Sequence, residues 1–554
     1  MNAYNLDLDP TYIKYKTILT ENRNEYEFDL SDRDLAPIPM LKGNLPRSEN
    51  FSIDYLGRVA APMAKLAANT LAVKLKSAWD PLDELQDYED FFQVLEKPKV
   101  ISTYQSDKAF AEQRLSGPNP LVLKRVDDLA QYFQSSDIAE IETKLGDSID
   151  LTDNLYVADY TELLPIPSGT FDRGRTYLPR PIALFSWRSE ASSDRGQLVP
   201  VAIKLDVPLK DKTILTPEDE SLDWLYAKTC VQIADGNYHE LMSHLCRTHF
   251  VMEPFAIATG QHLPETHHLG ALLRQHFKFM LALSKFARKT LIASGGSIDR
   301  ILAGELSGSL EIIRQAFRTW RFDSFSFPQA IAARGMDDAQ KLPHYPYRDD
   351  GKLVWDAIWQ FVSAYLGLHY HTADSISSDR ALQDWAQKLH LVFSIAGGDG
   401  KGMPAQIDTL EQLVEVVTTI VFTCGPQHAA VNFPQYEYMT FAPNMPLSSY
   451  REFAGAAEFT QKDFMRFLPP SQQAAGQLST TFLLSSFRYD RLGHYDPSFF
   501  EAFADGMQDK VKTVVTAFQQ QLDVVEAEID RRNQNRTVPY PYLKPSLIPN
   551  SISI

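Results

Sequence analysis

The sequence predicts a mainly α fold, with one large helical domain that contains a small β-sheet element. Residues 155–205 hold three apolar runs, LYVADY, PIALFSW and LVPVAIKL, separated by turns rich in Gly, Pro and Ser, which is typical of short strands. After Asp219, periodic apolar positions predict helices over 221–260, 268–293, 352–366, 381–396, 408–431 and 497–531. An aromatic content of 11% is ample for a deep apolar core.

Charge and cysteine content exclude several classes of protein. A net charge of −17 argues against nucleic-acid binding, because phosphate contacts need clustered Lys and Arg. Cys230, Cys246 and Cys424 are too scattered for a disulfide framework or a zinc knuckle, so we expect a reducing compartment. The sequence shows neither a signal peptide nor an apolar run long enough to span a bilayer. We therefore expect a cytoplasmic protein, with peripheral membrane contact as the remaining option.

The N-terminal region divides into an arm and a helix. Residues 1–58 are polar and contain scattered prolines, so we expect an irregular arm, followed by a catalytic domain over 59–554. The segment VAAPMAKLAANTLAVKLKSAW, Val59 to Trp79, has the pattern of an amphipathic helix. Such a helix either docks on its own core or lies on a membrane surface.

The densest histidine cluster is YHELMSHLCRTHF, which holds His239, His244 and His249. Its H-E-x-x-x-H spacing excludes the H-E-x-x-H zinc-protease motif, whose histidines are four residues apart. Five residues on an α-helix place side chains about 140° apart, too far to share one ion. A π-type turn brings them together. If His244 and His249 bind a common metal, their helix is therefore expected to contain a π-bulge; the alternative is three histidines packed in ordinary helical turns.

Two further features stand near the end of the chain. In CGPQHAAVNFPQY, His428 and Asn432 are four residues apart, which places them on one face of a helix. A third histidine completes a nitrogen set that suits iron.

The terminus LKPSLIPNSISI is apolar at Ile548, Ile552 and Ile554, so it favours burial. A buried terminal carboxylate needs a positive partner such as a metal, unless the tail only docks in a surface groove.

Together these three segments resemble the lipoxygenase family. WLYAKTCVQIADGNYHELMSHLCRTHFVMEPFAIATGQHLP is similar to the family's first iron-ligand helix, HAAVNFPQY to its second, and PNSISI to its C-terminal hexapeptide. SGPNPLVLKR, NLYVADY and LPRPIALF also resemble family blocks. The resemblance covers roughly residues 80–554, with the motifs in the family's order. It implies a lipoxygenase-type helical catalytic domain of the short bacterial or cyanobacterial kind, without the lipid-binding β-sandwich domain that precedes many members.

The resemblance implies a non-heme iron dioxygenase, which removes a bis-allylic hydrogen from a polyunsaturated fatty acid and inserts O₂ to give a hydroperoxide. Linoleate and arachidonate are typical substrates of the family. The implied iron ligands are His244, His249, His428, Asn432 and the carboxylate of Ile554, whereas His239 is not a ligand.

The resemblance also implies roles for residues around the metal. Glu240 and Gln435 match positions that support the ligands and link them to the substrate channel. In the segment HFKFMLALSKFARKTLIASGG, Leu283, Ala287 and Leu291 follow one another at i, i+4 and i+8, which is equally typical of core packing. Ala287 matches the position where Ala or Gly governs stereochemistry, Ala favouring the S product. Leu291 is expected to shape the O₂ side, and Leu283 and Ile298 the pocket.

Two alternatives stay open. A hydroperoxide isomerase, or epoxyalcohol synthase, on the same fold would use the same ligands and differ in O₂ access. An iron-free helical lipid-binding protein would share the shape without the chemistry.

Overall fold

The computed structural model describes residues 22–76, 82–146, 150–171, 174–189, 196–453 and 458–554. It is mainly helical with a small antiparallel sheet, as the sequence predicts. The predicted strands are confirmed as the longer members of a sheet with the order β3-β4-β7-β8-β9. The strands are β1 (Phe28–Asp29), β2 (Met40–Leu41), β3 (Lys124–Arg125), β4 (Leu155–Asp159), β5 (Thr170–Phe171), β6 (Gly174–Arg175), β7 (Ile182–Ser189), β8 (Gly196–Leu209) and β9 (Lys212–Leu215).

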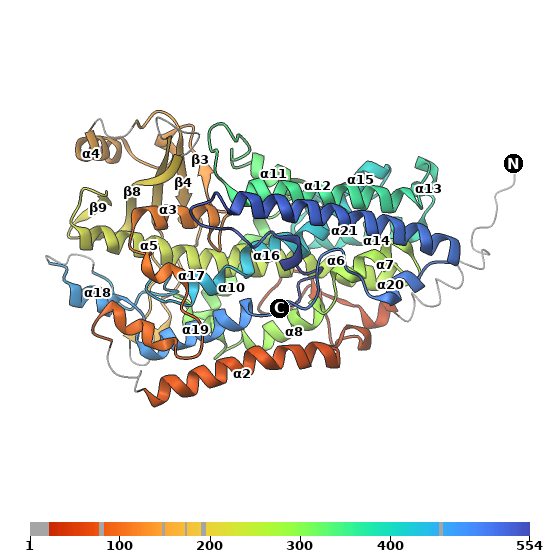
Figure 1. The fold of residues 1–554 in the computed structure, drawn as a ribbon, viewed down its shortest axis with the longest axis horizontal. Helices are drawn as coiled ribbons and strands as arrows, with labels where there is room; N and C mark the ends of the chain where they lie inside the picture. The colour runs from red at the N-terminus through yellow and green to blue at the C-terminus, as the bar shows by residue number, and fades with distance from the viewer. Residues whose placement is uncertain (1–21, 77–81, 147–149, 172–173, 190–195, 454–457) are drawn as a thin grey trace.

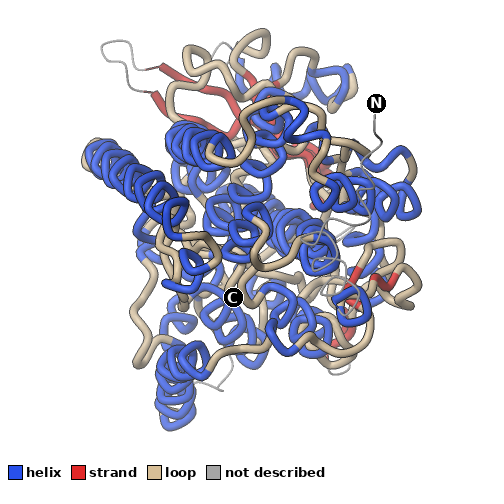
Figure 2. The backbone as a smooth tube through the Cα atoms, turned by 90° about the vertical axis from the view of Figure 1, so that its right-hand side faces the viewer, coloured by secondary structure: helices blue, strands red, loops and turns tan. Residues whose placement is uncertain are grey.

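Helices make up most of the remainder (Figure 1, Figure 2). The α-helices are α2 (Ile53–Leu75), α3 (Asp107–Ser116), α4 (Ser135–Leu145), α5 (Ser221–Tyr238), α6 (Val251–His262), α7 (His268–His276), α8 (Met280–Thr290), α9 (Ser297–Ile301), α10 (Leu306–Thr319), α11 (Phe327–Ala332), α12 (Pro346–Gly367), α13 (Ala373–Ser377), α14 (Arg380–Gly397), α15 (Leu410–Phe422), α16 (His428–Asn432), α17 (Gln435–Met439), α18 (Gln461–Phe467), α19 (Ser471–Ser485), α20 (Pro497–Glu501) and α21 (Asp505–Asn533). Two π-helical segments occupy His239–Phe250 and Thr423–Gln427, and short 3-10 turns occupy Arg47–Glu49, Leu85–Phe91, Lys99–Ser102, Leu129–Gln131, Phe322–Ser324, Asp399–Gly402 and Pro545–Leu547.

One continuous helical rod forms the centre of the molecule. The α-helix α5, the π-helix His239–Phe250 and α6 follow one another without a break, as the predicted helix over 221–260 requires. Nearly every side chain of the rod is buried, which is typical of a helix enclosed by protein on all sides. Figure 1 shows α5 crossing the view, with α12 and α21 on one side and α2 on the other. The histidine-bearing segment therefore lies deep in the core.

The predicted helix over 268–293 is wrong in one respect, because the structure divides it. α7 ends at His276, and α8 begins at Met280. Between them, Phe279 adopts a left-handed backbone conformation, with φ of 64°. This conformation interrupts an α-helix and turns the Phe279 ring into an aromatic cluster with Phe51, Tyr55 and Tyr489.

The N-terminal region also differs from the prediction. Residues 1–21 lie outside the described residues, but in the rest of the arm β1 pairs with β2. α2 begins at Ile53, six residues before the predicted start, because the side chain of Ser52 accepts a hydrogen bond from the Tyr55 amide and caps the helix. The last helical residue is Leu75, and Trp79 lies outside the described residues.

The three cysteines are buried and unpaired. Among the described residues, no helix has the length and apolar character needed to cross a bilayer.

A buried ion pair fixes the central rod to its surroundings, and its loss is predicted to destabilise the fold. The Arg114 guanidinium lies 3.0 Å from the Asp235 carboxylate, and neither side chain is exposed. Asp235 also accepts hydrogen bonds from Asn119 and Tyr160. We expect Arg114→Met to lower the thermal unfolding midpoint, at a cost of about 3–5 kcal/mol, because it leaves a buried carboxylate unpaired. In scanning calorimetry, the double variant R114M/D235L is expected to recover part of the loss; an unchanged midpoint in R114M contradicts this account.

Candidate metal centre

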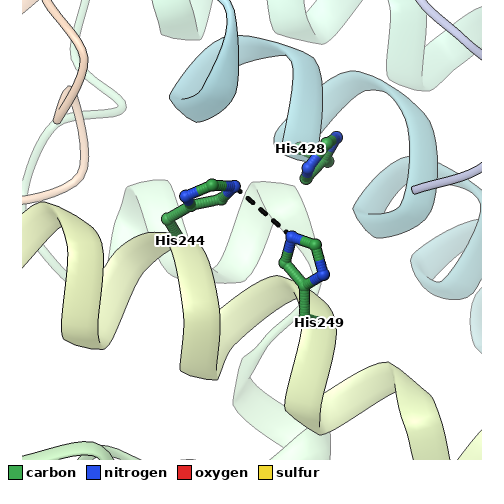
Figure 3. Close-up of side chains that lie close together, drawn as sticks. All are labelled: His244, His249 and His428. Carbon is green, nitrogen blue, oxygen red and sulfur yellow. Dashed lines mark hydrogen bonds between the residues drawn. The ribbon is translucent and has the colours of Figure 1, made fainter. Parts of the chain in front are cut away.

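The π-helix brings His244 and His249 together. Although the two residues are five apart in sequence, their Nε2 atoms lie 3.4 Å apart, because the whole segment His239–Phe250 is π-helical. Figure 3 shows both rings projecting from this helix toward each other. The predicted π-bulge is therefore confirmed and extends over 12 residues. A separation of 3.4 Å suits two nitrogens that share one ion at the bond lengths of about 2.1 Å typical of imidazole ligands.

His428 completes a triangle from the second helix. It is the first residue of α16, and its ring centroid lies 5.4 Å from that of His244 and 5.1 Å from that of His249. A second π-segment, Thr423–Gln427, directly precedes it, and the sequence analysis missed this feature. Pro426 inside the helical pattern was the available signal, since proline removes an α-helical hydrogen bond. One ligand atom from each of the three histidines lies within 4.8 Å of the others.

Burial keeps the three imidazoles neutral. His244, His249 and His428 are at most 5% exposed. Burial lowers the pKa of His249 and of His428 well below the usual value, and the neighbouring imidazoles lower it further. The pKa of His244 is also lowered by burial, although Glu240 partly opposes the shift. Neutral imidazole is the form that binds metals.

Unsatisfied nitrogens show that the triangle lacks a partner within the protein. Neither ring nitrogen of His428 has a hydrogen-bond partner among the described residues, and Nδ1 of His249 has none. Buried polar atoms are normally paired, so an orphaned imidazole in the core indicates a missing ligand. A cation between the three rings would take one nitrogen from each ring, including one of the two orphaned nitrogens of His428, and the donor set fits a transition metal.

His239 and Glu240 do not belong to the triangle, but Glu240 contacts His244 and sets its orientation. His239 donates from Nε2 to the Val431 carbonyl at 2.7 Å, which turns it away from the triangle. The Glu240 carboxylate lies 3.4 Å from Nδ1 of His244 and 3.5 Å from Nδ1 of His239. Burial alone would raise the pKa of Glu240, but the hydrogen bonds and charges of the two histidines outweigh it and hold the pKa well below its usual range. An ionised Glu240 draws the His244 proton to Nδ1 and leaves the Nε2 lone pair facing the triangle.

Asn432 and Gln435 form a second buried pair. Gln435 donates from Nε2 to the Asn432 side-chain oxygen at 3.0 Å, and Asn432 donates to the Leu484 carbonyl at 2.7 Å. Both side chains are fully buried. These bonds fix the orientation of the Asn432 amide, and its oxygen keeps a second lone pair for another partner.

The C-terminal tail is threaded into the protein. Ile548 and Ile552 are fully buried, as expected, whereas Ile554 is partly buried. The tail crosses the second ligand helix so closely that a Cβ on Gly425 would lie 2.8 Å from the Pro549 carbonyl. The Ser553 carbonyl accepts a hydrogen bond from Tyr55, and the Ile554 side chain packs against the aromatic cluster around Tyr55. No Lys, Arg or His ion pair of the terminal carboxylate occurs among the described residues.

The expected channel residues lie on α8 and just beyond it. Ala287 and Ile298 are buried, and Leu291 is partly buried where α8 ends. The Leu291 amide donates to the Ala287 carbonyl at 2.8 Å, and the Ile298 amide donates to Leu291 at 3.0 Å, so the three are held together. Leu283 packs on the same aromatic cluster as Ile554.

A second histidine cluster has an ordinary structural explanation. His267, His268 and Asp379 lie within ligand distance of one another. The Asp379 carboxylate, however, already accepts bonds from His267, from Tyr370 and from the Leu382 amide at the start of α14. His267 Nδ1 and His268 Nε2 also lack partners among the described residues, but the carboxylate of this cluster is already bonded to three donors and caps a helix.

Comparison with known proteins identifies the family. The lipoxygenase family model matches residues 175–540. The chain is 35% identical to the linoleate 9/13-lipoxygenase of Pseudomonas aeruginosa, and the match covers 85% of this chain and 70% of that protein. It is 31% identical to the human hydroperoxide isomerase ALOXE3, and that match covers 86% of this chain and 66% of the relative. Among solved structures, a coral 8R-lipoxygenase superposes with a TM-score of 0.86 at 29% identity, covering 98% of this chain and 82% of that one. The chain therefore belongs to the lipoxygenase family.

Proposed function

We propose that this protein is a non-heme iron dioxygenase that converts polyunsaturated fatty acids to hydroperoxides. The observation that carries the proposal is the π-helical pairing of His244 and His249 opposite His428, whose two ring nitrogens have no partner among the described residues. The relatives' names support the substrate class, because a bacterial relative is named for linoleate and a human one for polyunsaturated fatty acids.

The residues present fit one iron ion. His244, His249 and His428 would hold it, with the Asn432 side-chain oxygen and the Ile554 carboxylate as further ligands. Three neutral nitrogens, an amide and one carboxylate add little negative charge, which favours a strongly oxidising centre. When bound, the iron supplies the one-electron oxidation that removes hydrogen from a carbon between two cis double bonds.

The protein's own residues orient the ligands and the substrate. Glu240 holds a proton on Nδ1 of His244, and Gln435 holds the Asn432 amide in place. Leu283, Ala287, Leu291 and Ile298 would line the pocket for the pentadiene. The substrate radical is spread over five carbons, so the pocket decides which end and which face O₂ reaches. With only a methyl group, Ala287 would cover one face and favour the S product.

We also propose peripheral contact with a membrane through α2, in a protein of the cytoplasm. Lipoxygenase substrates are apolar lipids, and α2 exposes large apolar side chains, including Ile53, Leu71 and Leu75. The catalytic domain would then begin at this helix, with the preceding arm packed on it.

A hydroperoxide isomerase is the second candidate, because one relative with 31% identity bears that name. The two activities are separated by O₂ consumption. We expect aerobic incubation with linoleate to give conjugated-diene absorbance and O₂ loss in a one-to-one ratio. Turnover of linoleate hydroperoxide without O₂ uptake on linoleate, in protein that contains iron, contradicts the dioxygenase proposal.

Iron content provides an independent prediction. We expect His244→Gln and His428→Gln to lower iron per chain at least about tenfold, because each removes a nitrogen ligand. His239→Gln is the matched control: it changes a buried histidine of the same π-helix that faces away from the triangle. Elemental analysis of the purified variants measures the outcome. Full iron occupancy in H428Q, or equal loss in H239Q, contradicts the assigned ligand set.

Stereochemistry tests the channel residues. We expect Ala287→Gly to raise the R hydroperoxide from a minor product to a comparable or larger fraction, because it opens the face that the methyl group covers. Chiral chromatography of the reduced product measures the ratio, and Ser284→Ala, a change of similar size one turn away on α8, is the control. An unchanged ratio of R to S product in A287G contradicts the proposal that Ala287 controls O₂ access.

A further inference from the structure

One face of α2 is apolar and open to solvent along the whole helix. Its largest side chains are far more exposed than core residues, with Ile53 at 90%, Leu71 at 60% and Leu75 at 79%. At 100° per residue these side chains fall on one stripe with Leu56, Ala60, Met63, Ala64 and Ala67, and exposed Lys74 interrupts the stripe near its C-terminal end. The helix has 23 residues, so the stripe is about 35 Å long. Figure 1 shows α2 along the outer edge of the molecule, beside α19.

Cationic side chains follow one flank of this stripe. Arg58, Lys65 and Lys76 share the same side of the helix, a quarter to a third of a turn from the apolar face. Arg58 pairs with Asp54, and Lys76 pairs with Asp90. Lys65 forms no ion pair among the described residues, so its charge is available to a partner outside the protein.

A groove of about 560 Å³ opens below the same flank, between α2 and the region where α19 ends. We call it the Arg488 groove. Phe433, Tyr436, Phe482 and Tyr542 form its aromatic walls, and Lys65, Ser486 and Arg488 contribute donors. The Arg488 guanidinium lies 3.8 Å from the centroid of the Phe433 ring, and its Nε donates to the Leu547 carbonyl at 3.0 Å.

Apart from the bond of Arg488 Nε to Leu547, Arg488 and Ser486 have no hydrogen-bond acceptor among the described residues. Arg488 has no acidic partner among the ion pairs of the described residues, and burial lowers its pKa to about 10. The buried hydroxyl of Ser486 also has no hydrogen-bond partner there. Two carboxylates line the groove, Glu96 and Glu437, but Glu437 accepts the Val100 amide at 2.9 Å, and burial raises its pKa. A half-buried guanidinium beside an unpaired hydroxyl is a site for an oxyanion.

We propose that the Arg488 groove binds the phosphate of an anionic phospholipid while the apolar face of α2 lies in the membrane interface. The proposal rests on the membrane contact proposed above and adds the headgroup chemistry and the residues that recognise it. A planar guanidinium binds two phosphate oxygens at once, the Ser486 hydroxyl can donate to another, and Lys65 can reach over from the helix flank.

The surroundings favour a lipid over a free anion. The groove adjoins a helix whose apolar stripe is long enough to lie on a bilayer, and its aromatic walls suit the boundary between headgroups and acyl chains. The net charge of −17 also opposes general attraction to an anionic surface. Preference for anionic lipid therefore has to come from a local cationic site rather than from the overall field.

Vesicle co-sedimentation tests the proposal with the full-length protein. We expect vesicles of phosphatidylcholine and phosphatidylglycerol to bind more protein than vesicles of phosphatidylcholine alone. Arg488→Gln is expected to reduce binding to the anionic vesicles about fivefold and to leave binding to neutral vesicles unchanged. Arg531→Gln, which makes the same charge change on the exposed end of α21, is the matched control and is expected to behave as the wild type.

Two further variants show whether a loss of binding comes from the headgroup site, from the membrane contact or from misfolding. Leu71→Ser/Leu75→Ser is expected to weaken binding to both kinds of vesicle, because it removes apolar side chains that the proposal places in the membrane; normal binding by this variant overturns the membrane contact itself. Arg488→Lys keeps the charge and is expected to retain part of the preference, which excludes misfolding as the cause in R488Q.

Equal binding of R488Q and wild type to anionic vesicles overturns the headgroup site. If the wild type binds both kinds of vesicle equally, while inorganic phosphate binds the wild type and not R488Q, the groove binds a free anion and the lipid assignment is wrong. Iron content and dioxygenase activity on detergent-dispersed linoleate are measured in parallel, because Arg488 packs on Phe433, whose ring contacts that of His428.

Discussion

The structure depends on the close approach of three imidazoles in a buried core. His244 and His249 lie on one helix and His428 on another, and burial removes the proton that would otherwise keep the rings apart. An α-helix cannot bring together side chains five residues apart, so the central rod changes its winding over His239–Phe250. The second ligand helix contains its own π-segment immediately before His428. Both departures from α-helical geometry thus occur where ligand atoms converge.

The rest of the fold supports these two rods. The ion pair of Arg114 with Asp235 fixes the central rod at one turn before the π-helix, and the tail crosses the other rod at Gly425 through Ile548, Pro549 and Asn550. Asn550 alone makes bonds with Asp490, His494, Gly493 and His276. These contacts fix the backbone near the three histidines on several sides, as a preorganised metal site would require.

Part of the site was predictable from spacing and part from the family resemblance. The five-residue interval between His244 and His249 predicts a π-type turn if the two share a metal, and the interval from His428 to Asn432 predicts a shared helical face, whereas the full set of metal-binding residues is what the resemblance implies. The apolar end of the chain predicts the buried tail. The break at Phe279 was not predictable, because the left-handed conformation there follows from packing against Phe51 and Tyr55, which lie more than 200 residues away in sequence. The early start of α2 was indicated by Ser52, a good capping residue, but the arm's polar composition obscured it.

The crossing at Gly425 has a consequence for local unfolding. Ile548, Pro549 and Asn550 lie against Gly425, and Asn550 is bonded to Asp490, His494 and His276, so this segment can leave the helix only if these contacts break together. The helix that carries His428 is therefore protected from local opening by a segment that is distant in sequence.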